Sequence, residues 1–156
     1  MIYVFDTSSV SHLQHFYVDV FPSLWDGLGT MVTNGNLLST REVSKELENF
    51  SLSAHVASWT KVNKQIFTMP NAEELLFVSE IFKVNHFQAL IGEKQRLKGT
   101  PVADPFVIAC AKRHGGIVVT EERFKPNAAK IPNVCEHFKI GCISLEQFMQ
   151  QQAWKF

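Results

Sequence analysis

Acidic residues that follow short apolar stretches are the residues best placed to do chemistry in this chain. Asp6 comes directly after the apolar residues 1–5, and Glu121 and Glu122 come after a β-branched stretch at 117–120. A short, almost wholly apolar run is typical of a strand that is buried on both faces. Open α/β sheets bind their ligands at the carboxyl ends of the strands. We therefore expect these acids to lie at the carboxyl edge of one sheet.

Two further acids can reach the same edge from the starts of helices. Glu46 lies on a predicted helix at 41–50, with Glu42 four residues earlier as a second candidate, and Asp104 precedes Pro105 at the start of another helix. Carboxylates gathered in one cleft repel one another and raise each other's pKa, and a bound cation removes that cost. Oxygen ligands without a matching His or Cys cluster suit Mg²⁺ or Mn²⁺. Such an ion can activate a water molecule and stabilise charge on a phosphodiester.

Each acid also has a purely structural interpretation. Aspartate is a favoured N-cap, so Asp6 and Asp104 can do no more than cap helices. Helix glutamates are rarely buried, so Glu42 and Glu46 can simply be solvated. Six histidines are scattered along the chain, and no two pairs of them suit a zinc site.

The elements that must position these acids alternate along the chain, and alternation predicts an α/β fold with a parallel sheet covered on both faces. Residues 131–135 are expected to form a loop or short bridge, and Ser144 to cap a final helix. The predicted strands are 1–5, 37–40, 117–120 and 140–143, and the predicted helices are 10–21, 24–31, 41–50, most of 51–92, and one that starts at 104 and ends near His114.

The 156 residues suffice for one domain, predicted to span 1–156, and 46% hydrophobic content excludes a disordered chain. No signal peptide or membrane span is evident, and the three cysteines fit reduced thiols, so we expect a cytoplasmic protein. Because 15 basic and 15 acidic residues balance, any nucleic-acid-binding surface must be local. The candidates for RNA binding are Arg41, Lys45, Arg123 and a loop at 92–101 with Lys94, Arg96 and Lys98, whose alternative is simple solvation.

Four pieces of sequence carry a family resemblance through their order and spacing. They are Val4-Phe5-Asp6-Thr7-Ser8-Ser9, Glu46-Leu47, Ala103-Asp104-Pro105-Phe106-Val107-Ile108-Ala109 and Val118-Val119-Thr120-Glu121-Glu122. Together they resemble a PIN domain, the nuclease fold of the VapC-type toxins. The stretch at 131–135 resembles a little-characterised PIN-like subfamily of small bacterial and archaeal proteins. The resemblance implies a three-layer α/β/α sandwich with a short parallel central sheet.

The resemblance also implies a Mg²⁺- or Mn²⁺-dependent endoribonuclease, often the toxin of a toxin–antitoxin pair. Its partners would be an RNA substrate, a cognate antitoxin and, in many relatives, a second copy of the chain. Asp6, Glu46 and Asp104 would form the core metal site. The fourth acid of the family is commonly an Asp two residues after the strand-ending Thr, so Glu122 takes that position and Glu121 is the alternate. The supporting hydroxyls would be those of Thr7 or Ser8 and of Thr120.

Other functions fit less well or remain open. A haloacid-dehalogenase-type phosphohydrolase requires a second Asp two residues after the first, where this chain has Ser8. A dinucleotide-binding fold requires a Gly-rich turn after the first strand, and a serine hydrolase requires a Gly-flanked nucleophile; neither is present. The remaining alternative is a catalytically idle PIN-like module that binds proteins, and it predicts no dependence on divalent metal.

Overall fold

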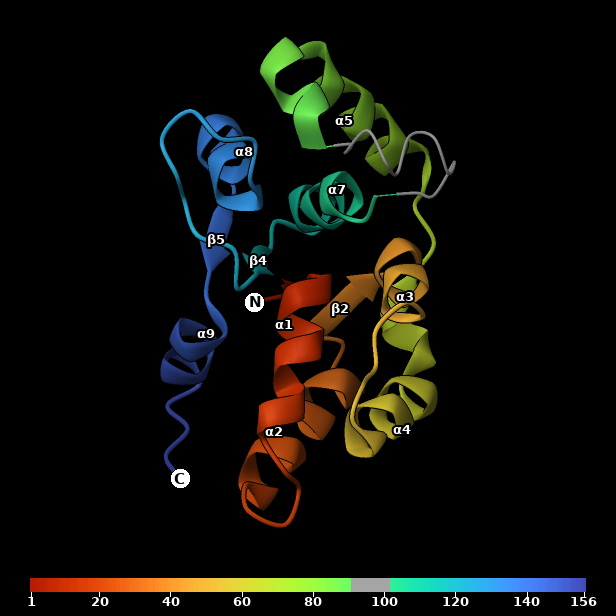
Figure 1. Ribbon diagram of the computed structural model, residues 1–156, viewed down its shortest axis with the longest axis vertical. Coiled ribbons are helices and arrows are strands. Elements are labelled where there is room, and N and C mark those ends of the chain that lie inside the picture. The colour runs from red at the N-terminus through yellow and green to blue at the C-terminus, as the bar shows by residue number, and fades with distance from the viewer. Residues whose placement is uncertain (91–101) are drawn as a thin grey trace.

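Five parallel strands form the sheet at the centre of the computed structural model, which describes residues 1–90 and 102–156 (Figure 1). The order across the sheet is β3-β2-β1-β4-β5, and every neighbouring pair is parallel. The predicted α/β class with a short parallel sheet is therefore confirmed. The strands are β1 (Tyr3–Phe5), β2 (Leu37–Thr40), β3 (Phe67–Thr68), β4 (Ile117–Val119) and β5 (Gly141–Ile143).

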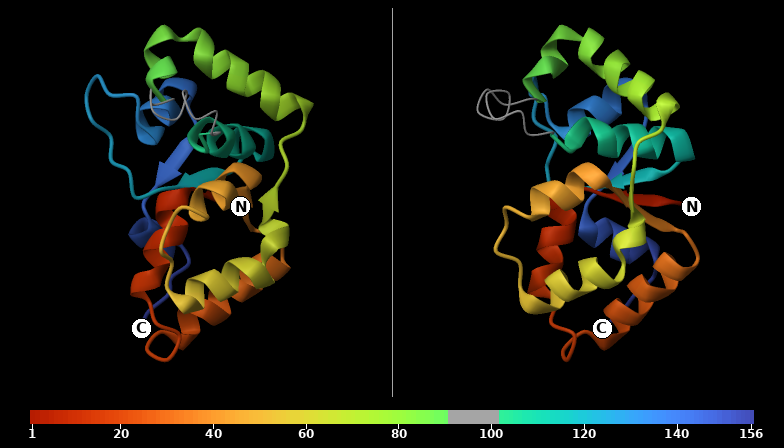
Figure 2. Two further views of the ribbon diagram at one scale, coloured as in Figure 1. Left: turned by 45° about the vertical axis from the view of Figure 1, so that its right-hand side comes forward. Right: turned by 90° about the vertical axis from the view of Figure 1, so that its right-hand side faces the viewer.

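Helices cover both faces of the sheet. In both views of Figure 2, α5 and α7 lie on one side of the strands, and α2 and α4 lie on the other. The loop basic residues Lys94, Arg96 and Lys98 lie outside the described residues. The helices are α1 (Thr7–His12), α2 (Pro22–Thr33), α3 (Arg41–Leu47), α4 (Ala54–Val62), α5 (Ala72–Lys83), α7 (Asp104–His114), α8 (Ile131–Phe138) and α9 (Leu145–Gln151), with 3-10 turns at Leu13–His15, Lys64–Ile66 and Asn85–Leu90.

Strand β1 is the middle of the sheet because its side chains can be buried on both faces. Val4 and Phe5 are fully buried, and Phe148 of α9 packs edge-on against Phe5 with ring centroids 5.1 Å apart. Gly115, with φ of +60°, ends α7 in the left-handed conformation. At Gly116, a Cβ would lie 2.5 Å from the carbonyl oxygen of Ile2, so only glycine lets β4 start this close to β1.

Several local predictions differ from the structure for identifiable reasons. The helix expected at 10–21 begins earlier, at Thr7, and stops at His12, where a 3-10 turn follows; Pro22 starts the next helix instead of ending this one. Strand β3 is only two residues long, which is too short to produce a sequence pattern. Residues 131–135 belong to helix α8, with Pro132 in its first turn, so the predicted loop is wrong.

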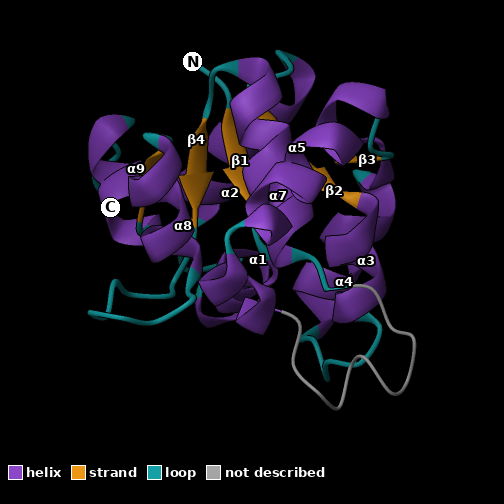
Figure 3. Cartoon of the chain, turned by 90° about the horizontal axis from the view of Figure 1, so that it is seen from above, coloured by secondary structure: helices purple, strands orange, loops and turns teal. Residues whose placement is uncertain are grey.

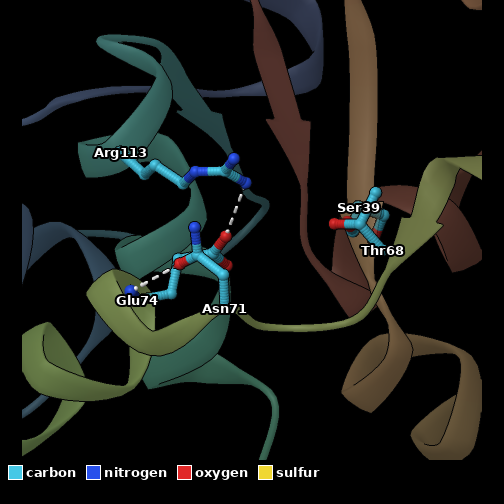
Figure 4. Close-up of polar contacts among 5 residues, drawn as sticks. All are labelled: Ser39, Thr68, Asn71, Glu74 and Arg113. Carbon is cyan, nitrogen blue, oxygen red and sulfur yellow. Dashed lines mark hydrogen bonds and ion pairs between the residues drawn. The ribbon is translucent and has the colours of Figure 1, made fainter.

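Helix α5 buries a different set of residues from the one its apolar spacing suggests. Leu75 and Leu76 are exposed, while Glu74 is buried in their place. Figure 4 shows the reason: the guanidinium of Arg113 on α7 reaches the Glu74 carboxylate, with Nη1 and Oε1 3.1 Å apart. Asn71 caps the same helix by accepting a hydrogen bond from the backbone N–H of Glu74. The buried face of α5 therefore combines an ion-paired acid with the apolar side chains of Phe77, Val78 and Ile81.

The strand order also predicts where a ligand should bind. The chain moves from β1 outward to β2 and β3, then returns to the other side of β1 for β4 and β5. The connection therefore reverses direction between β1 and β4, which lie side by side and run the same way in Figure 3. Open α/β sheets bind ligands in the crevice at the carboxyl ends of the two strands where this reversal occurs. In this chain those ends are Phe5 and Val119, which are followed by Asp6 and Thr120.

Candidate active site

Asp6 occupies the first position after β1 and is buried, with 3% of its surface exposed. Its Oδ1 accepts a hydrogen bond from the backbone N–H of Ser9 at 2.8 Å, so it caps α1. The structural interpretation of this residue is therefore correct, but it does not account for the rest of its contacts. Two hydroxyl groups from different parts of the chain also donate to the same carboxylate.

Those hydroxyls belong to Ser8 and Thr120, and each is itself held by a backbone amide. Thr120 Oγ1 donates to Asp6 Oδ2 at 2.5 Å and accepts from the N–H of Glu122 at 3.0 Å. Ser8 Oγ lies 2.8 and 2.9 Å from the two oxygens of Asp6 and accepts from the N–H of Glu121. Two amide–hydroxyl–carboxylate chains therefore fix Asp6 against the end of β4. Ser8 and Thr120 contact the acid that they were predicted to support.

Glu46 reaches the same region from α3, which Thr40 starts by capping the N–H of Val43. Thr7 Oγ1 donates to Glu46 Oε1 at 2.9 Å, and the backbone N–H of Ala103 donates to Oε2 at 3.4 Å. Glu46 thus links the end of β1 to the residue that precedes Asp104. It is half-buried, so the solvated interpretation is wrong, and Thr7 supports it as Ser8 supports Asp6.

Asp104 is the first residue of α7 and does not cap it, because Ala103 holds the N-cap position without a side-chain hydrogen bond. Burial first, and then the nearby negative charges of Glu122, Asp6 and Glu46, raise the pKa of Asp104 to about 8. The fold has therefore brought the four predicted acids within electrostatic reach of one another. Burial also raises the pKa of Asp6 and that of Glu46 above their ordinary values.

Glu121 and Glu122 both cap later helices, but they differ in how their charges affect the pKa values of the other acids. Glu121 Oε1 accepts from the N–H of Leu145 at the start of α9, and Glu122 Oε2 accepts from the N–H of Ile131 at the start of α8, both at 2.9 Å. The charge of Glu122 raises the pKa of both Glu46 and Asp104, whereas that of Glu121 has no such effect. This difference favours Glu122 as the fourth acid. Only Oε2 of Glu122 caps α8, so its other carboxylate oxygen is available to a ligand.

Two buried acids outside this cluster, Glu42 and Glu74, form ion pairs, and the acids of the cluster form none with the described residues. Glu74 pairs with Arg113, and the buried Glu42 pairs with Arg41, whose Nη2 lies 3.2 Å from Glu42 Oε1. Within residues 1–90 and 102–156 these are the ion pairs present, and neither includes Asp6, Glu46, Asp104 or Glu122. The cost of gathering four carboxyls is therefore not offset by a basic side chain in the described structure.

The donor set fits a hard divalent cation better than any other group. All four candidates are carboxylates, the ligands that Mg²⁺ and Mn²⁺ prefer. Asp6 receives three donors on about four lone-pair positions, so it retains room for one more ligand. In the described ranges no three His, Cys, Asp or Glu side chains are already arranged as a closed metal site. Binding would thus require these carboxylates to converge further.

Of the predicted RNA-binding residues, Lys45 and Arg123 are exposed, and Arg41 is partly engaged by Glu42. One basic residue was missed. Lys130 is exposed just before α8, and its positive charge lowers the pKa of Asp104, so it lies near the acids. No sequence signal marks it, because its position follows from the unpredicted start of α8 at Ile131.

Comparison with known proteins supports this architecture. A chain in the crystal structure of VapBC2 from Rickettsia felis bound to a DNA fragment from their promoter is similar to this one, with a TM-score of 0.51 and 14% sequence identity. The match covers 92% of this chain and 98% of that chain. The fold is therefore PIN-like and of the VapC type, as the sequence motifs predicted. No curated protein sequence is significantly similar, and no helix in the described residues is long and apolar enough to cross a membrane. By the match of its residues 3–156, the chain belongs to the family described as Domain of unknown function (DUF4411).

Proposed function

We propose that this protein is a Mg²⁺- or Mn²⁺-dependent endoribonuclease that acts as the toxin of a toxin–antitoxin pair. One observation carries the proposal. Four carboxyls from four different segments gather where the strand order reverses, and no ion pair among the described residues includes any of them. Burial, together with the negative charges of the other three, raises the pKa of Asp104 to about 8. Repulsion and burial make such a cluster costly to fold, and clusters of carboxyls with raised pKa values are typical of functional sites.

Asp6, Glu46 and Asp104 would hold the ion, with Glu122 as the fourth acid. A bound Mg²⁺ or Mn²⁺ would supply an activated water and neutralise charge on the scissile phosphate. Ser8 and Thr120 keep the Asp6 carboxylate in one orientation, and Thr7 does the same for Glu46. Asp104 must lose its proton before its oxygens can serve as ligands. Lys130, beside Asp104, is placed to attract the phosphate backbone.

The proposed partners follow from the same cluster. A likeness to VapBC2 of Rickettsia felis, which was crystallised with a DNA fragment from their promoter, supports a search for an antitoxin. An antitoxin that inserts an Arg or Lys among the four carboxyls would complete the missing ion pairs and block the site. A homodimer is also part of the proposal, and size-exclusion chromatography with light scattering tests it directly.

Cleavage of labelled single-stranded RNA tests the activity. The purified protein should cut in Mg²⁺ or Mn²⁺ and not in EDTA, and Asp6→Asn and Asp104→Asn should abolish cutting while circular dichroism stays native. Asp26→Asn on α2 is the matched control, because Asp26 is exposed and outside the cluster. If the wild type binds no Mn²⁺ by calorimetry and cuts no RNA, the chain is an idle PIN-like module, and a protein partner should be sought instead.

A further inference from the structure

The segment between β4 and α8 is a loop whose conformation is fixed by several hydrogen bonds. Asn133, only 9% exposed, donates from Nδ2 to the carbonyl of Lys125 at 2.7 Å and accepts from its N–H. The N–H of Ala128 donates to the same carbonyl, and Asn127 adopts a positive φ of 63°. A buried amide is expensive unless it is satisfied, so holding Lys125 is the role of Asn133.

The loop leaves the side chain of Phe124 exposed to solvent. This side chain is 52% exposed, and it lines two separate surface hollows of about 550 and 510 Å³. The first hollow also contains Thr120 and Glu122, so it opens beside the acidic cluster. The second contains His137 and the clamping residue Asn133. Phe124 therefore lines both hollows, and its exposed ring can contact a flat ligand in either of them.

The charges around Phe124 favour a polyanion as that ligand. Arg123 and Lys125 flank it in sequence and are exposed, and Lys130 at the end of the loop lies near Asp104. Residues 123–130 thus contain three basic and no acidic residues in a chain whose formal net charge is zero, although Glu122, Glu136 and Glu146 line the two hollows. An exposed aromatic side chain between cations is the arrangement with which proteins hold single-stranded nucleic acids, by stacking bases while basic groups follow the phosphates.

We propose that Phe124 is a stacking platform for one unpaired base of a single-stranded RNA, whose phosphates contact Arg123, Lys125 and Lys130. This inference rests on the proposed ribonuclease function and narrows its substrate to unpaired RNA. A base in a duplex has both faces covered by its neighbours and cannot stack on a protein side chain without leaving the helix. The base held on Phe124 would place the neighbouring phosphodiester beside Glu122, which lines the same hollow.

Fluorescence anisotropy with labelled single-stranded RNA of about 12 nucleotides and random sequence tests the inference, a length within the usual range of site sizes. All variants carry Asp104→Asn to prevent cutting. In that parent, Phe124→Ala should weaken binding by about fivefold or more, the expected effect of losing one stacked base. Phe124→Trp should bind as the parent does, and Phe124→Leu should behave as Phe124→Ala. Phe156→Ala is the matched control, since Phe156 is 58% exposed and lies at the chain end.

Two further oligomers separate stacking from charge. A ribose-phosphate oligomer without bases should bind the Phe124→Ala protein and its parent equally, and a fully paired duplex should bind more weakly than the single strand. Equal affinity of Phe124→Ala and parent for single-stranded RNA would refute the stacking role and leave the ribonuclease proposal intact. If the parent binds none of these oligomers and the wild type cuts none, both the inference and the proposed function are wrong.

Discussion

Replacing Asp104 by Asn should stabilise the metal-free protein while it destroys activity. The carboxyl of Asp104 has an ordinary pKa of 3.8 when the chain is unfolded and a pKa of about 8 when it is folded. Between these two values the folded protein binds a proton that the unfolded chain does not. The free energy of unfolding of the wild type must therefore fall as the pH rises from about 4 to 8. Asparagine cannot ionise, so the free energy of unfolding of the variant does not fall with pH through this group.

The magnitude follows from the interval between the two pKa values. Each pH unit within it changes the free energy of unfolding by about 1.4 kcal/mol, so the variant gains up to about 4 kcal/mol at pH 7 and nearly nothing at pH 4. This is an upper bound, because Asp104 is partly exposed and water screens part of the repulsion. For a chain of this length, each kcal/mol raises the Tm by roughly 2–4 °C.

Thermal unfolding in EDTA at pH 4, 5.5 and 7, followed by circular dichroism, measures this gain. The Tm difference between Asp104→Asn and wild type should grow with pH, and the exposed Asp26→Asn control should show no such trend. Adding Mn²⁺ at 100 times its Kd should stabilise the wild type by about 2.7 kcal/mol and leave the variant unchanged. A variant that is less stable at pH 7, or equally stabilised at pH 4 and 7, would refute the electrostatic reasoning.

Three other predictions concern single contacts. Ser8→Ala and Thr120→Val should each lower RNA cleavage or metal affinity by about 10–100-fold without unfolding the protein, because each removes a hydroxyl that orients the Asp6 carboxylate. Unchanged kinetics would contradict this positioning role. Glu122→Gln should weaken Mn²⁺ binding by calorimetry while Glu121→Gln does not, since each amide still caps its helix; the reverse result would make Glu121 the fourth acid. Arg113→Met should cost about 1–3 kcal/mol in urea unfolding by leaving Glu74 buried without its partner, and adding Glu74→Gln should recover part of that loss.

Much of the fold could be predicted from the sequence because its signals are local. The apolar run at β1, the turn before β2 and the glycine stop after α7 each depend on residues that are close in the chain. The capping box of Ser144 and Gln147 and the cap at Asn71 are local as well, and the cap at Ser144 was predicted. Strand β3 was missed because two residues are too few to produce a sequence pattern, and helix α8 was missed although Pro132 in its first turn is a local start signal.

The candidate site shows the same division. The residue types and order of Asp6, Glu46 and Asp104 are visible in the sequence. Their burial is not, because it depends on α3 and α7 meeting the end of β1. Lys130 and Phe124 had no signal at all, since their places near the acids depend on how Asn133 holds the intervening loop. Likewise, only packing distinguishes Glu74, which pairs with Arg113, from the site acids, which form no ion pair with the residues that the structure describes.

The sequence by itself thus determined the alternation of strands and helices, the parallel sheet and the set of acids at strand and helix ends. Hydrophobic periodicity and capping act over a few residues, so they can be read along the chain. Only the tertiary structure decided which acids share a low-dielectric space, which of Glu121 and Glu122 reaches Asp104, and which acids are neutralised by arginine. Electrostatic interaction depends on distance through space and on exclusion of water, and neither quantity exists until the chain has folded.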